Sequence, residues 1–432
     1  MSPRDFRARD FGDGDINWPI DYDDLAPHYT EIEQLIGVCG SHENLAALPD
    51  GDFLPPLPLR RPDVAMQSAV RRMRLLPLRA IPTRKAIETR ADAPNVCLQC
   101  GHCVHGCRTG SIYKFSSRLL PLIEGRRNFR IAYETKVLRL RRASGSSRIE
   151  AVECLDTSKQ ERFEVLADTF IVAAGALETS RLLLNSTDDA WPNGLANSSG
   201  LVGCYLQDHV RARASGSLWW LGGSKPADPP GIGDHLLIPR FLFSASDFRG
   251  GFQIQCGHML PWLPFYLDGM AVFPARLKDL LARWLFSTYV GLFFMGKPSA
   301  RISNRLRRSN KCDRYGVPQV DVDYAWSNED LQMQKSMQLW GRKILQAAFA
   351  IGVNAAPDTL PGLGIHYAGV CRMAANPHDG VVDRGCRSFD HPNLYLCDGG
   401  VMPDLSEKNP TLTIMALANR LAATLSSRGA DQ

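Results

Sequence analysis

The 432 residues are enough for two or three domains, and 44% hydrophobic with 22% charged residues is the composition of an ordinary globular protein. The net charge of +5 is small and its Lys and Arg are mixed with Asp and Glu, so the sequence predicts no nucleic-acid partner. No apolar run reaches the roughly 20 residues of a transmembrane helix, and no signal peptide follows Met1, so we expect no transmembrane segment and a cytoplasmic protein.

The first ninety residues predict one surface helix and a long irregular connection. Apolar residues recur at helical spacing before Gly37: Leu25, Tyr29, Ile32 and Ile36. Residues 47–64 are rich in proline and predict an extended crossing segment, which we place within residues 40–90. A dinucleotide-binding domain should open with a strand, GxGxxG and a helix. Gly12 and Gly14 lack the third glycine and the preceding strand, so we expect that this unit is missing from these 432 residues.

Four of the twelve cysteines are closely spaced: Cys97, Cys100, Cys103 and Cys107. This spacing is that of the bacterial ferredoxin run, which wraps an iron–sulfur cluster and is followed by Pro, whereas Arg108 follows here. Zinc with His102 or His105 is a second interpretation, and structural or redox-active thiols are a third. The other eight cysteines are scattered singly, which favours buried thiols over a disulfide framework.

The middle of the chain predicts two kinds of structure. Residues 130–175 alternate as a strand meander, and an apolar strand then stops at Ala174-Gly175 before a helix. From residue 213, aromatic, proline and alternating apolar residues predict an antiparallel sheet that forms the wall of a pocket. Ser327 and Asp330 form a capping-box pattern, and the helix that follows should end at Gly352. Its apolar stripe is Met333, Met337, Trp340, Ile344 and Ala348.

The last seventy residues hold the strongest candidate site. His366 stands among small and apolar residues, and the apolar run 394–397 stops at Asp398-Gly399-Gly400. Asn409 is a good N-cap and Pro410 suits the first position of a helix, whose apolar stripe is Leu417, Leu421 and Leu425. Because a helix N-terminus favours an anion, an imidazole, an amide and this terminus can converge on one small site.

Three ordered motifs carry a family resemblance: HxxGxCRM from His366, LYLxDGGxxP from Leu394 and NPTLTxxAxAxR from Asn409. Together with VAAGALETSRLLLNS (172–186), they closely resemble the glucose–methanol–choline (GMC) family of flavin oxidoreductases. The resemblance implies an α/β FAD-binding domain, incomplete at its N-terminus, interleaved with an α+β substrate domain built on an antiparallel sheet. We place the remainder of the FAD domain at 1–212, the substrate domain at 213–355, and a segment returning to the active site at 356–432.

The resemblance also implies roles for individual residues. His366 is the base that contacts the substrate hydroxyl, and Asn409 takes the second position of the catalytic pair. The residues that match the FAD-binding positions of the family are Val137, Ala174, Gly175, Asp398, Gly399, Pro410 and Thr411.

The expected activity is FAD-dependent oxidation of a primary or secondary alcohol, such as a sugar, polyol or cyclic alcohol, to a carbonyl, with hydride passing to flavin N5. If the cysteine loop holds a cluster, we expect an electron-acceptor protein or a quinone as partner. The alternative is a flavin-less remnant, or an electron-transfer module built around that loop.

Overall fold

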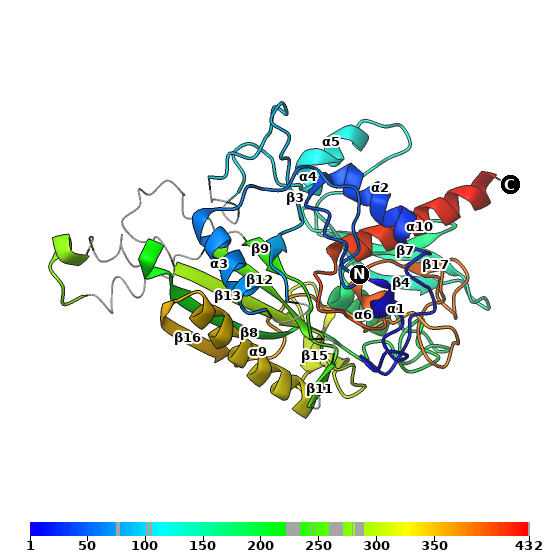
Figure 1. Ribbon diagram of the computed structural model, residues 1–432. Helices are drawn as coiled ribbons and strands as arrows, with labels where there is room; N and C mark the ends of the chain where they lie inside the picture. Colours follow the sequence, from blue (N-terminus) through cyan, green and yellow to red (C-terminus); the bar gives the residue numbers. More distant parts are fainter. Residues whose placement is uncertain are drawn as a thin grey trace.

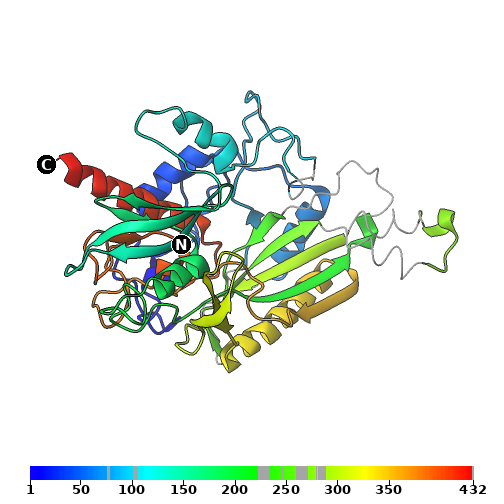
Figure 2. The same cartoon turned by 180° about the vertical axis from the view of Figure 1, so that it is seen from behind.

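The computed structural model describes residues 1–74, 78–100, 103, 106–221, 234–242, 244–245, 247–258, 271–278, 280 and 289–430. Two regions lie side by side in both views of the molecule (Figures 1 and 2). One packs helices and small sheets around the C-terminal helix, and the other is a larger antiparallel sheet with helices against it. The expected α/β fold with an antiparallel-sheet part is therefore confirmed.

The N-terminal segment forms short elements that pack on the first region. After α1 (Pro3–Phe6), Gly12 and Gly14 lie in turns, and α2 (Ala26–Ile36) ends at Gly37, whose φ of 69° suits glycine. β1 (Val38–Cys39) pairs with β3 (Lys85–Ala86). The extended segment expected over 40–90 is interrupted by α3 (Arg61–Arg72), because Pro62 suits a first turn and Asp63 accepts a hydrogen bond from the backbone of Arg60.

The predicted strand meander is confirmed as a three-stranded antiparallel sheet of β4 (Thr135–Arg142), β5 (Ile149–Asp156) and β6 (Glu161–Leu166). The short helices α4 (Phe115–Arg118) and α5 (Leu120–Ile123) precede it. β7 (Phe170–Val172) then pairs in parallel with β17 (Leu394–Leu396), and α6 (Ala176–Asn185) follows β7 as predicted. The pairing brings the Ala174-Gly175 turn next to Asp398, more than two hundred residues away in sequence.

The second region is a six-stranded sheet of order β16-β8-β13-β12-β9-β2, antiparallel at each pairing. Its strands are β2 (Ile81–Pro82), β8 (Val210–Ser217), β9 (Asp234–Ile238), β12 (Phe252–His258), β13 (Tyr289–Gly296) and β16 (Ile351–Pro357). Smaller elements accompany it: η2 (Trp219–Leu221), β10 (Ser244–Ala245), β11 (Phe248–Arg249), β14 (Arg305–Cys312) and β15 (Pro318–Asp323).

Helix α9 (Asn328–Ala347) packs along this sheet (Figure 1). The predicted cap is confirmed, because Ser327 Oγ accepts from Asp330 N and Asp330 Oδ2 accepts from Ser327 N. The predicted stripe is also confirmed: Met333, Met337, Ile344 and Ala348 are buried and Trp340 packs against the same core. The predicted end at Gly352 is wrong. The helix stops at Ala347 because Phe349 adopts a left-handed conformation with φ 55°, and Gly352 lies in β16.

Helix α10 (Thr411–Ala430) runs beside α2, with Leu417 and Leu421 buried in the first core and Leu425 partly buried. It begins one residue later than predicted. Pro410 holds the capping position, and its carbonyl oxygen accepts the first helical hydrogen bond from Ile414 N at 3.0 Å. None of the helices in the described part of the chain has the length and hydropathy that a membrane crossing requires.

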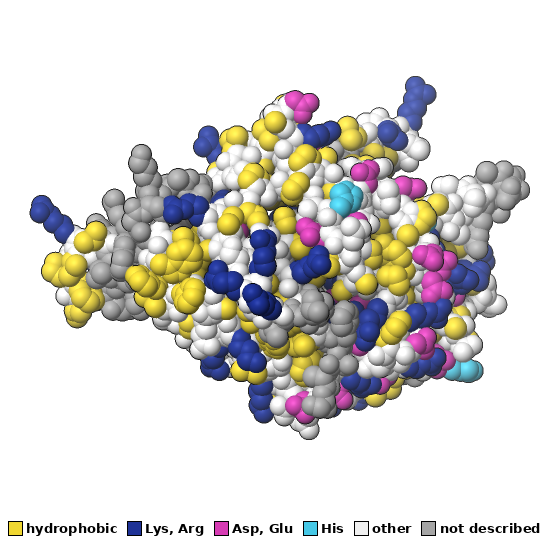
Figure 3. Space-filling model, viewed as in Figure 1, with side chains coloured by type: hydrophobic (Ala, Val, Ile, Leu, Met, Phe, Trp, Pro, Cys, Tyr) yellow, Lys and Arg dark blue, Asp and Glu magenta, His cyan; other side chains and the backbone are white. Residues whose placement is uncertain are grey.

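Charged side chains are not confined to one sign or one region. On the face shown in Figure 3, Lys and Arg gather near the middle and hydrophobic side chains lie on both sides of them. Much of this charge is paired internally, as in the contact of Arg84 with Asp50 at 2.6 Å.

Candidate active site

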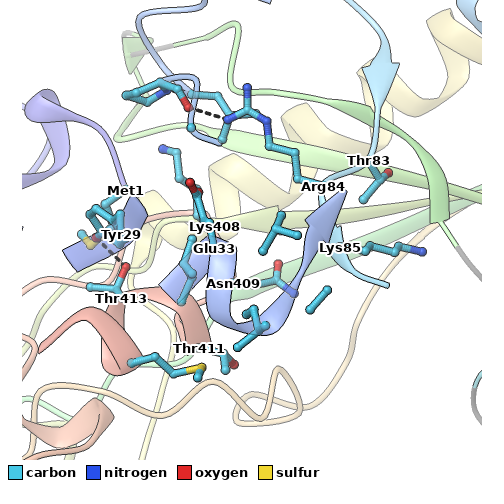
Figure 4. Close-up of a pocket in the computed structure, with 18 of the residues that line it drawn as sticks. Met1, Tyr29, Glu33, Thr83, Arg84, Lys85, Lys408, Asn409, Thr411 and Thr413 are labelled. Atoms are coloured by element: carbon cyan, nitrogen blue, oxygen red, sulfur yellow. Dashed lines mark hydrogen bonds between the residues drawn. The ribbon is translucent and has the colours of Figure 1, made fainter. Parts of the chain in front are cut away.

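A cavity of about 570 Å³ opens where α2, the β2–β3 turn, β12 and the start of α10 meet. α2 contributes Tyr29 and Glu33, and the turn contributes Arg84 and Lys85 (Figure 4). Burial raises the pKa of Tyr29, whose hydroxyl contacts Thr413 Oγ1 at 2.8 Å, so this phenol stays protonated. A cavity of this size, lined by both apolar and polar side chains, suits a small molecule or part of a cofactor.

The start of α10 forms one wall of this cavity. Thr411, Leu412 and Thr413 all line it, so the N-terminal turn of a twenty-residue helix faces the space. The unpaired N–H groups and partial positive charge of such a turn favour an electron-rich or anionic group beside them. Of the residues predicted to contact FAD, Thr411 therefore lines the cavity, and Pro410 is the buried residue before it.

Asn409 also lines the cavity, and it is exposed there. Its predicted role as N-cap is wrong, because its side chain is used differently. Asn409 Oδ1 accepts hydrogen bonds from Gln255 Nε2 at 2.9 Å and Gln253 Nε2 at 3.3 Å, both on β12. Two donors on the oxygen fix the orientation of the amide. Asn409 Nδ2 makes no hydrogen bond to the residues that the structure describes, and it is thus available to a ligand.

His366 lies in the segment before Gly369 and is half-buried. Its Nδ1 is buried without a hydrogen-bond partner among the described residues. Burial lowers the pKa of His366, and the nearby Asp208 carboxylate opposes this without reversing it. The imidazole is therefore neutral near pH 7, the state that a base requires.

His366 is not among the residues that line the cavity, so the structure does not place it against the same wall as Asn409. Residues 207–209 contact both the loop that carries His366 and the chain that leads to Asn409. On one side, Gln207 and Ala368 exchange backbone hydrogen bonds at 3.0 and 3.1 Å. On the other, the Gln207 side chain accepts from Leu405 N at 2.9 Å and donates to Pro403 O at 3.1 Å. This segment thus holds the His366 loop and the chain leading to Asn409 in one rigid unit.

Asp208 and His209 continue this connection. Asp208 is fully buried, and its carboxylate accepts from Gly364 N at 2.6 Å and His366 N at 3.0 Å. A side chain at Gly364 would collide with it, because a Cβ there would lie 2.3 Å from Asp208 Oδ1. The His209 ring meets the His366 ring edge to face, with centroids 5.0 Å apart.

A buried network of charges lies behind Asn409. Lys408 Nζ donates to Asp5 Oδ2 at 2.9 Å and Glu407 Oε1 at 2.6 Å, and Arg240 also pairs with Asp5. Burial alone would raise the pKa of Asp5, but the cations of Lys408 and Arg240 lower it. Because these groups are paired inside the protein, Lys408 has little freedom and the backbone leading into α10 is held in place.

The positions predicted on the adenine side of FAD lie elsewhere. Val137 on β4 is exposed, as are Ala174 and Gly175 at the end of β7, and none of them lines the cavity. Gly175 has φ 86°, and a Cβ there would meet no atom within 4 Å, so the surface beside it is open. These residues are accessible to a ligand, and their assignment to FAD remains a prediction.

Asp398 and Gly399 are buried, and both hold neighbouring segments of the backbone in place. The Asp398 carboxylate accepts from Gly175 N at 3.1 Å, Thr179 Oγ1 at 2.5 Å and Gly400 N at 2.7 Å. Gly399 opens the short helix η4 (Gly399–Val401), and a Cβ there would lie 2.5 Å from the carbonyl oxygen of Tyr367, beside His366. Both residues thus fix the local chain, and a direct cofactor contact by either remains a prediction.

The cysteine loop contains free thiols. Cys97, Cys100 and Cys107 are half-buried and Cys103 is exposed, while His102 and His105 lie outside the described residues. Burial would raise the pKa of Cys107, but hydrogen bonds, first that with Thr109, lower it to about 6. Within the described ranges, no group of three or more His, Cys, Asp or Glu is arranged to hold a metal ion, and an iron–sulfur cluster stays a prediction.

Sequence reasoning missed the residues that support the pair: Asp208, His209, Gln253, Gln255 and Lys408. The only available signal was LVGCYLQDHV (201–210), which resembles the family but carries no spacing that points to His366. The two glutamines alternate on one strand, a pattern that by itself indicates only a polar face.

The fold and the cavity beside a helix N-terminus agree with the flavin-dependent oxidoreductase that the sequence motifs predicted. Two family models match the chain, both described as GMC oxidoreductase: one over residues 84–211 and one over residues 298–418. They cover more than half of the chain together. The protein belongs to the GMC oxidoreductase family, as its sequence motifs predicted.

Similar proteins agree with this assignment. Paromamine 6′-oxidase of Streptomyces fradiae is 29% identical over 96% of this chain and 72% of its own length. 2-Methyl-1,2-propanediol dehydrogenase of Mycolicibacterium austroafricanum is 28% identical over 99% of this chain and 78% of its own. The crystal structure of pyridoxine 4-oxidase from Mesorbium loti superposes with a TM-score of 0.65 at 20% identity, covering 98% of this chain and 80% of that one, which supports the fold.

Members of this family bind FAD, and the cavity residues fit the flavin ring. The α10 N-terminal turn offers backbone N–H groups to an electron-rich ring edge, and the fixed amide of Asn409 offers a further donor.

Proposed function

We propose that this chain is an FAD-dependent enzyme that oxidises a primary or secondary alcohol of a sugar, polyol or cyclic alcohol to a carbonyl. The observation that carries the proposal is the connection of a neutral, half-buried His366 through residues 207–209 to the Asn409 wall of the cavity. FAD, when bound, supplies the N5 position that accepts the hydride.

His366 takes the hydroxyl proton. Its lowered pKa keeps the ring unprotonated near neutral pH, and Asp208 is close enough to favour the imidazolium that forms when the proton arrives. Asp208 also fixes the loop itself by accepting from the His366 amide, so the ring starts from one position. A base held in this way contributes about a hundredfold to ten-thousandfold.

Asn409 orients the substrate hydroxyl. Since Gln253 and Gln255 both donate to Oδ1, the amide presents Nδ2–H toward the cavity, where it can donate to the hydroxyl oxygen. This leaves the hydroxyl hydrogen directed to the base. The α10 N-terminal turn lines the cavity, and its backbone N–H groups would stabilise negative charge on a flavin held there.

The names of several relatives support an alcohol or sugar as the substrate. One acts on paromamine at a 6′ position and another on 2-methyl-1,2-propanediol. Their names include both an oxidase and a dehydrogenase, so the electron acceptor is a separate question. If the loop from Cys97 to Cys107 holds an iron–sulfur cluster, we expect electrons to leave through it to an acceptor protein or a quinone.

The test is single-turnover reduction of bound flavin under anaerobic conditions. Protein reconstituted with excess FAD is mixed with a panel of sugars, polyols and diols, and loss of the flavin absorbance is followed. His366→Ala should slow this reduction about a hundredfold or more with flavin still bound. His378→Ala, which removes an exposed imidazole twelve positions along, is the matched control and should be unaffected.

Two results would contradict the proposal. If His366→Ala reduces its flavin as fast as the parent, the base is another group. If the parent protein takes up no FAD even when FAD is in excess, the flavin-less alternative, an electron-transfer module built around the cysteine loop, gains support.

A further inference from the structure

Two buried imidazole nitrogens lie near each other without partners. Nδ1 of His366 and Nε2 of His209 each make no hydrogen bond to the residues that the structure describes. The two rings meet edge to face, at an interplanar angle of 77° and a centroid distance of 5.0 Å. Buried polar atoms usually have a hydrogen-bond partner, so two neighbouring rings that each keep an unpaired nitrogen require an explanation.

The tautomer of His209 follows from its other nitrogen. His209 Nδ1 lies 3.3 Å from the carbonyl oxygen of Gly296, and a carbonyl can only accept, so this contact favours the tautomer with hydrogen on Nδ1. This carbonyl is held in place, because a side chain at Gly296 would collide with Met333 and Met337 of α9. Burial lowers the pKa of His209 to about 3, so the ring is neutral and Nε2 carries a lone pair.

His366 Nδ1 lacks a hydrogen-bond acceptor among the described residues. The nearby Asp208 carboxylate is already used by two backbone amides, those of Gly364 and His366 itself. If His366 Nδ1 carries the hydrogen, the lone pair of His209 is the acceptor that lies beside its ring. A small rotation of either ring, or one shared water, pairs both atoms at once.

We propose that His209 is a positioning residue that holds His366 in the tautomer with hydrogen on Nδ1, which leaves Nε2 of His366 free to take the substrate proton. The role of His209 in catalysis rests on the proposed function, because it requires His366 to be the base. The tautomer of His366 can be measured whether or not that function is correct. His209 does not touch the substrate. It acts through His366, as an acceptor that fixes which nitrogen of the base is available.

Nitrogen-15 NMR of histidine-labelled protein tests the tautomer without flavin or substrate. The chemical shifts of the two ring nitrogens distinguish a protonated from an unprotonated nitrogen, and His366→Gln identifies the His366 signals. We expect hydrogen on Nδ1 in both His209 and His366. Hydrogen on Nε2 of either ring would overturn the inference, including the case in which His209 donates to the nearby main chain of Lys408.

Two variants separate positioning from packing. His209→Phe keeps a ring but removes the acceptor, and His209→Gln places an amide oxygen close to the position of Nε2. We expect His209→Phe to mix the His366 tautomers and to slow flavin reduction about tenfold to hundredfold, and His209→Gln to restore most of both. Unchanged His366 shifts in His209→Phe would refute the inference. If His209→Phe does not fold, the parent spectrum and His209→Gln still decide it.

The two failures can be told apart. A His366→Ala protein that reduces flavin normally defeats the proposed function but leaves the tautomer measured by NMR intact. A His366→Ala protein that is slow, combined with His366 carrying hydrogen on Nε2, leaves the proposed function intact and removes His209 from it.

Discussion

Asp398 offers the sharpest test of how this site is built, because the sequence assigned it to the cofactor and the structure gives it a structural task. Its carboxylate joins the turn after β7, the first turn of α6 and the start of η4 through Gly175, Thr179 and Gly400. We consider replacement by Ala, which removes the acceptor from all three donors, and by Asn, which keeps one oxygen.

The expected change in the free energy of unfolding depends on which of the three donors can form a hydrogen bond to water instead. Gly175 is exposed, so its N–H can bond to solvent and its loss counts little. Thr179 and Gly400 are buried, and a buried donor left without an acceptor costs about 1–3 kcal/mol. Asp398→Ala should therefore lower the free energy of unfolding by about 2–6 kcal/mol. Asp398→Asn should lower it by about half as much, since its oxygen can still accept from one of the two.

Urea unfolding followed by circular dichroism measures this change. The control is Asp390→Ala, because Asp390 also accepts two hydrogen bonds from one neighbour, Ser198, but does so at the surface. That variant should lose less than about 1 kcal/mol. A loss below about 1 kcal/mol in Asp398→Ala would refute the reasoning, and a cofactor contact would again be the better account of Asp398.

Three further predictions concern the rest of the chain. His209 has a folded-state pKa of about 3, below its ordinary value, so the free energy of unfolding should fall by about 1 kcal/mol for each pH unit below about pH 6.5. Burial raises the pKa of Asp404 to about 6, so this group has the opposite effect on stability between about pH 4 and 6. Urea unfolding of His209→Gln at a series of pH values isolates the contribution of His209. Cys107, with a pKa of about 6, should be the thiol of its loop that iodoacetamide labels fastest at pH 7. Iron analysis of anaerobically prepared protein tests the cluster, and less than one iron per chain would rule it out. Residues 1–432 contain no GxGxxG turn for the pyrophosphate, so we expect FAD to be lost on gel filtration, and stoichiometric retention would contradict this.

The sequence predicted best what depends on neighbours along the chain. Helix α2 with its glycine end, the meander of β4 to β6 and the capping box of Ser327 all follow from local pattern, and all are confirmed. The errors came where two signals competed. Proline suggested an extended chain over 40–90, but Pro62 opens a helix, and a glycine at 352 suggested a helix end that a non-glycine residue, Phe349, provides.

The site was predictable only in part, for a physical reason. A motif can name His366 and Asn409, since each belongs to a run of distinctive residues. It cannot show that Asn409 is held by β12 rather than capping α10, because that contact joins residues about 155 positions apart. The same applies to Asp208 and His209, whose meaning comes from the chain folding back on itself at residues 364–368.

The two residues of the proposed catalytic pair, His366 and Asn409, are held by contacts from distant parts of the chain. The base and the amide each sit on an irregular segment, and irregular backbone is held only by what it contacts. Asp208 under His366 and the Lys408 network behind Asn409 are buried and charged, whereas two glutamines hold the exposed Asn409 by two hydrogen bonds. The buried contacts are costly to break, since a buried group that loses its partner keeps the full penalty of desolvation. The position of the proposed pair therefore depends on these supporting residues, of which Gln253, Gln255 and Lys408 also line the cavity.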